Sequence, residues 1–276
     1  MRILSKVFEN DKITGCNVVD DAGHQFFVLK DALKQYTYTN AKITADNKVI
    51  GDNIPQVQAR SKQNISARTI TLYHGSHRGL DGTINAMRSR SSCDFGKGFY
   101  TGDYDKQAKM LISDDVNGHF YTLSVDLSAL NVYEFTDDVL WALYVGVNRG
   151  HIDIRPYSKL QKLLQEIDKH DVIVGLIADD KMMFVYAQFI EGVLTDKALI
   201  ACLQQVKLGK QFVFKNDAAC KKIKILADDQ LSVAERRSLL NIKQGMLSNI
   251  APMVANLQRL YRRQGLYIDE ILERYK

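Results

Sequence analysis

The hydrophobic and polar residues in positions 1–54 follow the pattern of short strands joined by turns. Two β-prone runs within residues 12–29 flank the turn residues 20–23, and this predicts a hairpin. A helical turn at 31–36 and a second hairpin at 41–51 are expected after it. This part of the chain is therefore predicted to form a small β-rich unit.

A polar stretch without periodicity, residues 53–66, follows this unit and is typical of a linker. From Thr69 onward, short apolar runs alternate with patterns of helical period. Strands are predicted at 70–73, 98–100, 120–125, 172–177 and 211–214. Helices are predicted at 105–112, 139–148, 158–169, 182–191 and 196–206. This alternation predicts an α+β fold.

The last part of the chain has the pattern of helices. Ser232 and Glu235 form a capping-box sequence, in which each side chain bonds a free N–H group at the start of a helix. Helix breaks are expected near 249–252 and at Gly265. The expected domains are 1–66, the β-rich unit with its linker; 67–228, the central α+β domain; and 229–276, a helical extension.

The net charge of +5 belongs entirely to the C-terminal part of the chain. Residues 1–220 contain 26 Lys and Arg and 26 Asp and Glu, whereas residues 221–276 contain 11 and 6. Such a basic segment binds nucleic acid or an acidic partner in some proteins and is a solvated helix face in others. Composition leaves both explanations open.

A hydrophobic share of 46% is ordinary for a globular protein. No stretch approaches the ~20 apolar residues of a membrane span, and the first residues lack the apolar run of a secretory signal. We therefore expect a cytoplasmic protein without membrane partners. Free thiols and no metal site are expected, because the four cysteines are far apart and form no C-x-x-C pair: Cys16, Cys93, Cys202 and Cys220.

Three separated stretches contain the residues that suggest chemistry. They are 72–76 (Leu-Tyr-His-Gly-Ser), 94–103 (Asp-Phe-Gly-Lys-Gly-Phe-Tyr-Thr-Gly-Asp) and 211–214 (Gln-Phe-Val-Phe). A histidine at the end of a strand, such as His74, can bind a ligand or serve as a hydrogen-bonded structural residue. The glycines of the second stretch allow either a close approach of the backbone to a ligand or a plain tight turn. Each stretch alone leaves these alternatives open.

Together and in this order, the three stretches resemble the ADP-ribosyltransferases of the diphtheria-toxin and poly(ADP-ribose) polymerase type, which use a His, Tyr, Glu triad. Residues 72–76 look like the first strand of that family, and residues 95–100 are close to its F-G-K-G-I-Y segment. Residues 211–214 are similar to its E-Y-I-V-Y strand, with Gln211 in the place of the glutamate. The resemblance implies the family's split β-sheet core with flanking helices.

An uncharacterised bacterial group related to these enzymes is similar too, because D-F-G-K-G-F-Y, A-D-D and Q-x-V-F segments recur in it. Here the A-D-D segment is residues 178–180, and the whole resemblance covers residues 69–217. It implies that NAD is a substrate, that His74 bonds its adenosine ribose and that Tyr100 stacks on its nicotinamide ring. The backbone of Gly75 would hold the carboxamide. The residues implied to contact NAD are His74, Gly75, Ser76, Phe95, Gly96, Gly98 and Tyr100.

Three departures from the polymerase pattern concern the activity. Ala108 stands where a serine would hold the carboxamide, and Leu111 stands where a second aromatic ring would stack. Gln211 can accept a hydrogen bond from the nicotinamide-ribose 2′-OH, but it has no charge and is no general base. Polymer elongation is therefore not expected, and either the acceptor needs no strong base or another carboxylate supplies it. The candidate carboxylates are Asp180 and Asp179, a pair that can also simply cap a helix or turn, with Asp94 after them.

The expected function is transfer of a single ADP-ribose from NAD to a macromolecular acceptor, protein or nucleic acid. The catalytic residues would be His74, Tyr100, Gln211 and Asp180. The related bacterial group implies a toxin or anti-phage effector, with an antitoxin or another partner protein. Water as the acceptor would make the protein an NAD glycohydrolase. The missing acid leaves a catalytically silent NAD- or RNA-binding module as a third hypothesis.

Overall fold

A computed structural model describes residues 1–9, 12–19, 25–35, 37–51, 54, 56–58, 69–81, 83–136, 138–177, 180–205, 209–248 and 250–276. The chain divides into two compact units, Met1–Asn64 and Ile65–Lys276. Most of the linker expected at 53–66, including the boundary near residue 66, lies outside the described residues, but residues 56–58 form a strand and not a linker, because they pair with the first strand of the chain.

The first unit contains a four-stranded sheet with the order β3-β2-β1-β6. Its strands are β1 (Arg2–Glu9), β2 (Lys12–Val19), β3 (Gln25–Leu29) and β6 (Gln56–Gln58). β2 and β3 pair antiparallel, which confirms the first predicted hairpin, although its turn residues 20–23 lie outside the described part. The sequence pattern does not predict β1, in which a polar residue, Ser5, is buried.

The remaining elements of the first unit agree with the sequence pattern. A 3-10 helix, η1 (Lys30–Gln35), forms the expected helical turn. β4 (Lys42–Ile43) and β5 (Val49–Ile50) form the second hairpin. Asn47 in its turn has φ +60°, a left-handed conformation that asparagine tolerates better than most residues.

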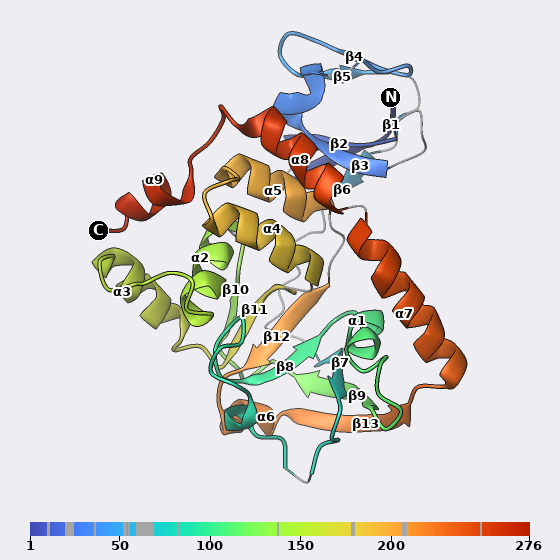
Figure 1. Cartoon of the computed structure of the whole chain (residues 1–276), viewed down its shortest axis with the longest axis vertical. Coiled ribbons are helices and arrows are strands. Elements are labelled where there is room, and N and C mark those ends of the chain that lie inside the picture. The colour runs from blue at the N-terminus through green and yellow to red at the C-terminus, as the bar shows by residue number, and fades with distance from the viewer. Residues whose placement is uncertain are drawn as a thin grey trace. The chain divides into compact units, whose positions relative to one another are not determined.

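A mixed seven-stranded sheet is the centre of the second unit (Figure 1). Its strand order is β10-β11-β12-β8-β7-β9-β13. The strands are β7 (Thr69–Ser76), β8 (Phe99–Gly102), β9 (His119–Asp126), β10 (Val132–Glu134), β11 (Val172–Leu176), β12 (Lys210–Phe214) and β13 (Ile223–Gln230). β10 and β11 pair parallel, and the other neighbours pair antiparallel. With the helices below, this confirms the predicted α+β class.

The helices of the second unit follow the order of the sequence predictions closely. They are α1 (Asp105–Leu111), α2 (Asp138–Asn148), α3 (Ser158–Ile167), α4 (Asp180–Ile190), α5 (Asp196–Gln205), α6 (Asp217–Cys220), α7 (Val233–Ser248), α8 (Ile250–Tyr261) and α9 (Ile268–Glu273). α1 packs against β7 and β8, while α5 packs against α2, α4 and α8. Among the described residues, no helix is both long enough and apolar enough to cross a membrane.

The capping box predicted at the start of the tail is present. The backbone N–H of Ser232 donates to Oε2 of Glu235 over 3.1 Å, and the N–H of Glu235 donates to Oγ of Ser232 over 3.2 Å. The predicted break at Gly265 is also present, because this residue follows α8 with φ +82°. The break expected near 249–252 falls partly on Asn249, which lies outside the described residues.

One strand crosses the expected boundary between the central domain and the helical extension. β13 runs from Ile223 to Gln230, and pairs with β9 at the edge of the sheet. Most of its side chains are exposed, including Ile225 and Leu226, so the strand has no regular alternation of buried and exposed positions. The sequence pattern therefore does not predict it, and the helices of the tail begin only at α7.

Candidate functional site

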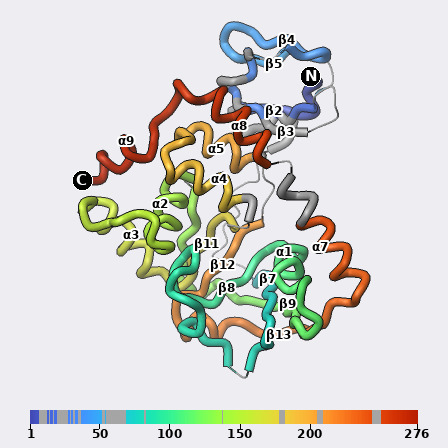
Figure 2. Tube along the Cα trace, in the orientation of Figure 1, coloured from blue at the N-terminus to red at the C-terminus, as the bar shows by residue number. Residues whose placement is uncertain are grey.

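The three stretches singled out in the sequence lie on neighbouring strands, in the order β12-β8-β7. Figure 2 shows β8 between β7 and β12 in the middle of the second unit, although β12 comes much later in the chain. Gly102 of β8 pairs with Gln211 of β12 on one side and with Tyr73 of β7 on the other. The fold thus joins the three stretches into one hydrogen-bonded region.

Tyr100 and Gln211 share one face of this sheet. Gln211 pairs with Gly102, two residues after Tyr100, and alternate residues of a strand point to the same face. Phe99 adjoins Tyr100 and points the opposite way, and the ring of His74 packs against it with centroids 4.6 Å apart. The structure therefore brings the side chains of Tyr100 and Gln211 together and leaves that of His74 on the other face.

A hydrogen bond holds His74 in one tautomer. Its Nδ1 lies 2.7 Å from the carbonyl oxygen of Tyr100, which only accepts, so Nδ1 carries the proton. Burial lowers the pKa of His74, and the bond to the Tyr100 carbonyl opposes this in part. The ring is therefore neutral near pH 7, and its Nε2 is an acceptor for a hydroxyl group.

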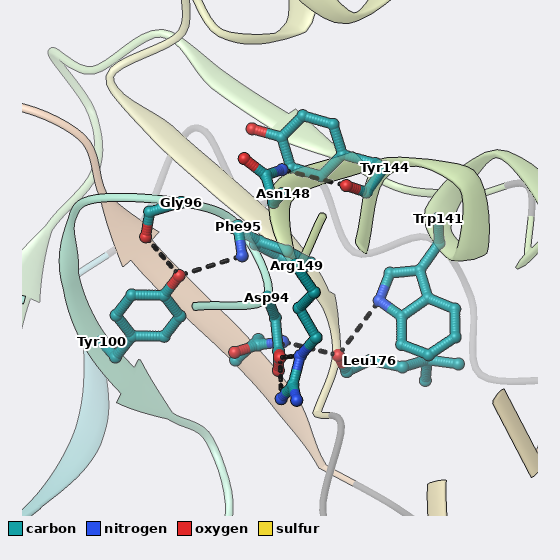
Figure 3. Close-up of polar contacts among 10 residues, drawn as sticks. Asp94, Phe95, Gly96, Tyr100, Trp141, Tyr144, Asn148, Arg149 and Leu176 are labelled. Carbon is teal, nitrogen blue, oxygen red and sulfur yellow. Dashed lines mark hydrogen bonds and ion pairs between the residues drawn. The ribbon is translucent and has the colours of Figure 1, made fainter. Parts of the chain in front are cut away.

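The hydroxyl group of Tyr100 bonds to its own loop. It donates to the carbonyl oxygen of Gly96 over 2.7 Å and accepts from the N–H of Phe95 over 2.9 Å (Figure 3). Burial is the main cause of a raised pKa for this phenol. Tyr100 is therefore a neutral ring of fixed orientation, which suits stacking better than proton transfer.

The glycines of the second stretch are required by the protein's own packing. Gly96 has φ +69°, and a Cβ atom there would lie 2.8 Å from Oδ1 of Asn148. A Cβ atom on Gly98 would overlap Cγ1 of Val213 in β12. The loop before β8 thus lies against α2 and β12; the positive φ accounts for Gly96, and the contact with β12 accounts for Gly98.

Phe95 anchors the same loop in the hydrophobic core. Its side chain is fully buried, and its ring centroid lies 5.6 Å from that of Phe135 and 5.5 Å from that of Tyr144. The carbonyl oxygen of Phe95 accepts a hydrogen bond from Nζ of Lys215, whose pKa is lowered by burial. Phe95 can therefore contribute to a ligand site only through the position of the loop.

Gln211 is buried, and its amide group has one orientation. Nε2 donates to the carbonyl oxygen of Leu176 over 2.9 Å and to Oδ2 of Asp94 over 3.3 Å. Both partners are acceptors, so the NH₂ group must face them and Oε1 is turned away. Within the described part of the chain no group donates to Oε1, which leaves this oxygen available to a hydroxyl group.

Asp94 connects Gln211 to an arginine that the sequence did not single out. Arg149, directly after α2, donates from Nε to Oδ1 of Asp94 over 2.6 Å, and its Nη2 forms an ion pair with the same oxygen (Figure 3). Asp94 is only 8% exposed. A buried and charge-paired carboxylate is a frequent feature of functional sites. In the sequence, Arg149 and Gly150 are indistinguishable from an ordinary helix end.

The end of the first stretch lies against α1. A Cβ atom on Gly75 would overlap the carbonyl oxygen of Ala108, so this helix packs directly on β7. Oγ of Ser76 donates to the carbonyl oxygen of Gly79 over 3.1 Å. Leu111, in the position where a second stacking aromatic would lie, is 59% exposed. The helix expected after Tyr100 is thus in contact with the strand that contains Gly75 and Ser76.

The structure describes the side chain of only one of the three candidate carboxylates, Asp94. Asp180 is the first residue of α4, but its side chain, together with residues 178 and 179, lies outside what the structure describes. Its role therefore stays a prediction. Asp94, the third candidate, contacts Gln211 directly.

The comparisons with known proteins give one match. A family model described as a protein of unknown function (DUF3990) matches residues 70–225, more than half of the chain. The matched range includes β7, β8 and β12, and it agrees with the expected similarity to an uncharacterised group of domains. No curated protein and no solved structure matches the chain.

Proposed function

We propose a function for this chain, which belongs to the DUF3990 family of proteins of unknown function. The function is transfer of a single ADP-ribose from NAD to a macromolecular acceptor. One observation carries the proposal: the three stretches on which the resemblance to ADP-ribosyltransferases rests lie side by side on β7, β8 and β12. β12 follows β8 by more than a hundred residues, so no local pattern in the sequence makes these two strands neighbours.

The chemistry of the individual side chains supports NAD as the substrate. The neutral ring of Tyr100, held by its loop, offers a face on which a cationic nicotinamide ring can stack. Oε1 of Gln211, on the same face of the sheet as Tyr100, is an acceptor, as a hydroxyl group of the nicotinamide ribose requires. Nε2 of His74 is also an acceptor, but this side chain lies on the other face of the sheet, so its bond to the adenosine ribose stays a prediction. On this proposal the protein acts mainly by orienting a dinucleotide.

The proposed reaction exchanges one bond to the nicotinamide ribose for another. The bond between C1′ of this ribose and the ring nitrogen breaks, and its electron pair leaves with neutral nicotinamide. A nucleophilic atom of the acceptor forms the new bond to C1′, and any proton it carries passes to solvent. The transition state has oxocarbenium character, which nearby oxygen dipoles such as Oε1 of Gln211 stabilise.

Labelled NAD tests the proposal and identifies the acceptor class. The full-length protein is incubated with NAD labelled in its adenylate phosphate and with whole-cell extract, and the products are digested separately with protease, RNase and DNase. We expect label in a macromolecular fraction, removed by one of these enzymes. Free ADP-ribose without labelled macromolecule would instead indicate an NAD glycohydrolase. No nicotinamide release at high protein concentration would contradict NAD turnover altogether.

A further inference from the structure

Two groups that accept hydrogen bonds face the side chain at position 211. The NH₂ group of Gln211 lies between the carbonyl oxygen of Leu176, at 2.9 Å, and Oδ2 of Asp94, at 3.3 Å. An amide satisfies both acceptors. A carboxylate at the same position would face two acceptors without a proton to offer, in a place where only 5% of the residue is exposed.

The charge of Asp94 is held in place from several directions. Arg149 bonds one carboxylate oxygen through Nε at 2.6 Å, which leaves the other oxygen toward Gln211. The next residue, Phe95, is fixed in the core among aromatic rings. The carbonyl oxygen of Leu176 also accepts from Nε1 of Trp141 over 3.2 Å (Figure 3). Neither acceptor can easily turn away from position 211.

We propose that Asp94, held by Arg149, is a positioning residue that selects an amide at position 211 and orients it. The pair turns the NH₂ group of Gln211 inward and its oxygen outward, and it opposes a carboxylate there. The departure from the glutamate of the related enzymes is therefore built into the site. The consequence for catalysis, a transfer reaction without a general base at position 211, rests on the proposed function, whereas the selection of an amide does not.

Four variants test the selection without NAD. Gln211→Glu adds a carboxylate beside Asp94, Asp94→Asn removes the existing one, and the double variant exchanges the amide and the carboxylate between the two positions. Gln211→Met is the matched control, because it loses the amide's hydrogen bonds without adding a charge. The thermal unfolding midpoint of each full-length protein is measured at several values between pH 5 and pH 8.

The sign of the pH effect follows from the added charge. Asp94 raises the pKa of the carboxyl group introduced by Gln211→Glu, so the folded state holds a proton that the unfolded state has already lost. Stability then falls as pH rises from the unfolded-state pKa toward the folded-state pKa. We expect the midpoint of Gln211→Glu to lie roughly 5 °C or more below the wild type at pH 8, and clearly less below it at pH 5.

The control and the double variant separate positioning from packing. The unfolding midpoint of Gln211→Met should lie the same number of degrees below that of the wild type at every pH. At pH 8 the unfolding midpoint of the double variant should be higher than the sum of the two single-variant shifts predicts. The reason is that the amide of Asn at position 94 again faces a carboxylate, now at position 211. A loss in Gln211→Glu that is independent of pH, or additive effects in the double variant, would overturn the inference.

Turnover provides a second readout. If NAD is consumed, the double variant should release nicotinamide at least tenfold faster than Gln211→Glu alone, and a slower double variant would contradict the inference. If neither the wild type nor any variant releases nicotinamide, the proposed function fails. The pH series then decides by itself whether Asp94 selects the amide.

Discussion

At the scale of a residue, Gln211 differs by one terminal group from the glutamate of the ADP-ribosyltransferases that the sequence resembles, and its surroundings suit the amide. Its NH₂ group is bound to Asp94 and Leu176, so only its oxygen can meet a ribose hydroxyl. Removal of the side chain leaves the surrounding bonds in part intact, since Asp94 keeps Arg149 and the Leu176 carbonyl keeps Trp141. The site should therefore stay folded in an alanine variant.

We accordingly predict that Gln211→Ala slows NAD turnover by a factor on the order of 10² or more, through loss of a hydrogen bond that tightens in the transition state. The rate of nicotinamide release under saturating NAD measures this, with circular dichroism as the check on folding. An unimpaired, folded Gln211→Ala variant would mean that β12 does not supply the third functional residue.

The burial of His74 leads to a prediction about how the stability of the protein depends on pH. Burial lowers its folded-state pKa below the unfolded value of about 6.5, so the unfolded state binds more protons as pH falls through this range. Its contribution to stability is therefore present above about pH 6.5 and is lost as pH falls further. Between pH 8 and pH 5, the free energy of unfolding measured with denaturant should fall less in His74→Ala than in the wild type. An equal loss in the two proteins would contradict this prediction.

At the scale of an element, the contact between the loop before β8 and β12 is too close for a larger residue. A Cβ atom on Gly98 would overlap Val213, whereas one on Gly102 would lie 3.4 Å from its nearest neighbour, an ordinary contact. Gly98→Ala should therefore cost about 1–3 kcal/mol of unfolding free energy, and Gly102→Ala far less. Urea denaturation of both variants checks this. Equal losses would show that the loop does not lie directly on β12.

Elements marked by a helical period or by an apolar run were predictable from the sequence, and elements with neither were not. The apolar runs at β11 and β12 are buried along nearly their whole length and were predicted as strands. β13 escaped prediction because it is an edge strand with mostly exposed side chains. The sequence analysis did not predict that β7, β8 and β12 are neighbours, since no local pattern encodes which strands pair.

The partner of Asp94 could not be predicted for a similar reason. Arg149 reaches Asp94 across more than fifty positions of the chain, and only the packing of α2 on the loop before β8 brings them together. Asp94 itself was predicted only as a third candidate carboxylate, after Asp180 and Asp179. Its contact with Gln211 depends on the register of β12 against β8, which a single sequence does not reveal.

At the scale of the whole molecule, the C-terminal tail has a buried apolar surface and an exposed basic one. α8 buries Val254, Leu257 and Tyr261 and packs against α5. Arg259, Arg262 and Arg263 are exposed. α8 and the turn that follows it, which contains Arg262 and Arg263, can therefore stabilise the second unit and still present a basic surface to solvent.

We predict that packing is the main role of α8, so that Leu257→Ala costs about 2–5 kcal/mol of unfolding free energy while Arg259→Ala costs little. Denaturant unfolding measures both. A titration with labelled RNA across a salt series checks the alternative, since each phosphate contact adds about 0.7–0.9 to the slope of log affinity against log salt. A steep slope that disappears when the three arginines are replaced together, in a folded protein, would assign the tail to nucleic-acid binding.

Release of nicotinamide from NAD by the purified full-length protein, compared with that by its Tyr100→Ala variant, tests whether this site binds NAD. We predict release by the wild type and none above background by the variant, because Tyr100 supplies the ring on which nicotinamide would stack. Thermal unfolding of both proteins establishes that the variant is folded. Equal rates of nicotinamide release by the two folded proteins would contradict the assignment of this site to NAD.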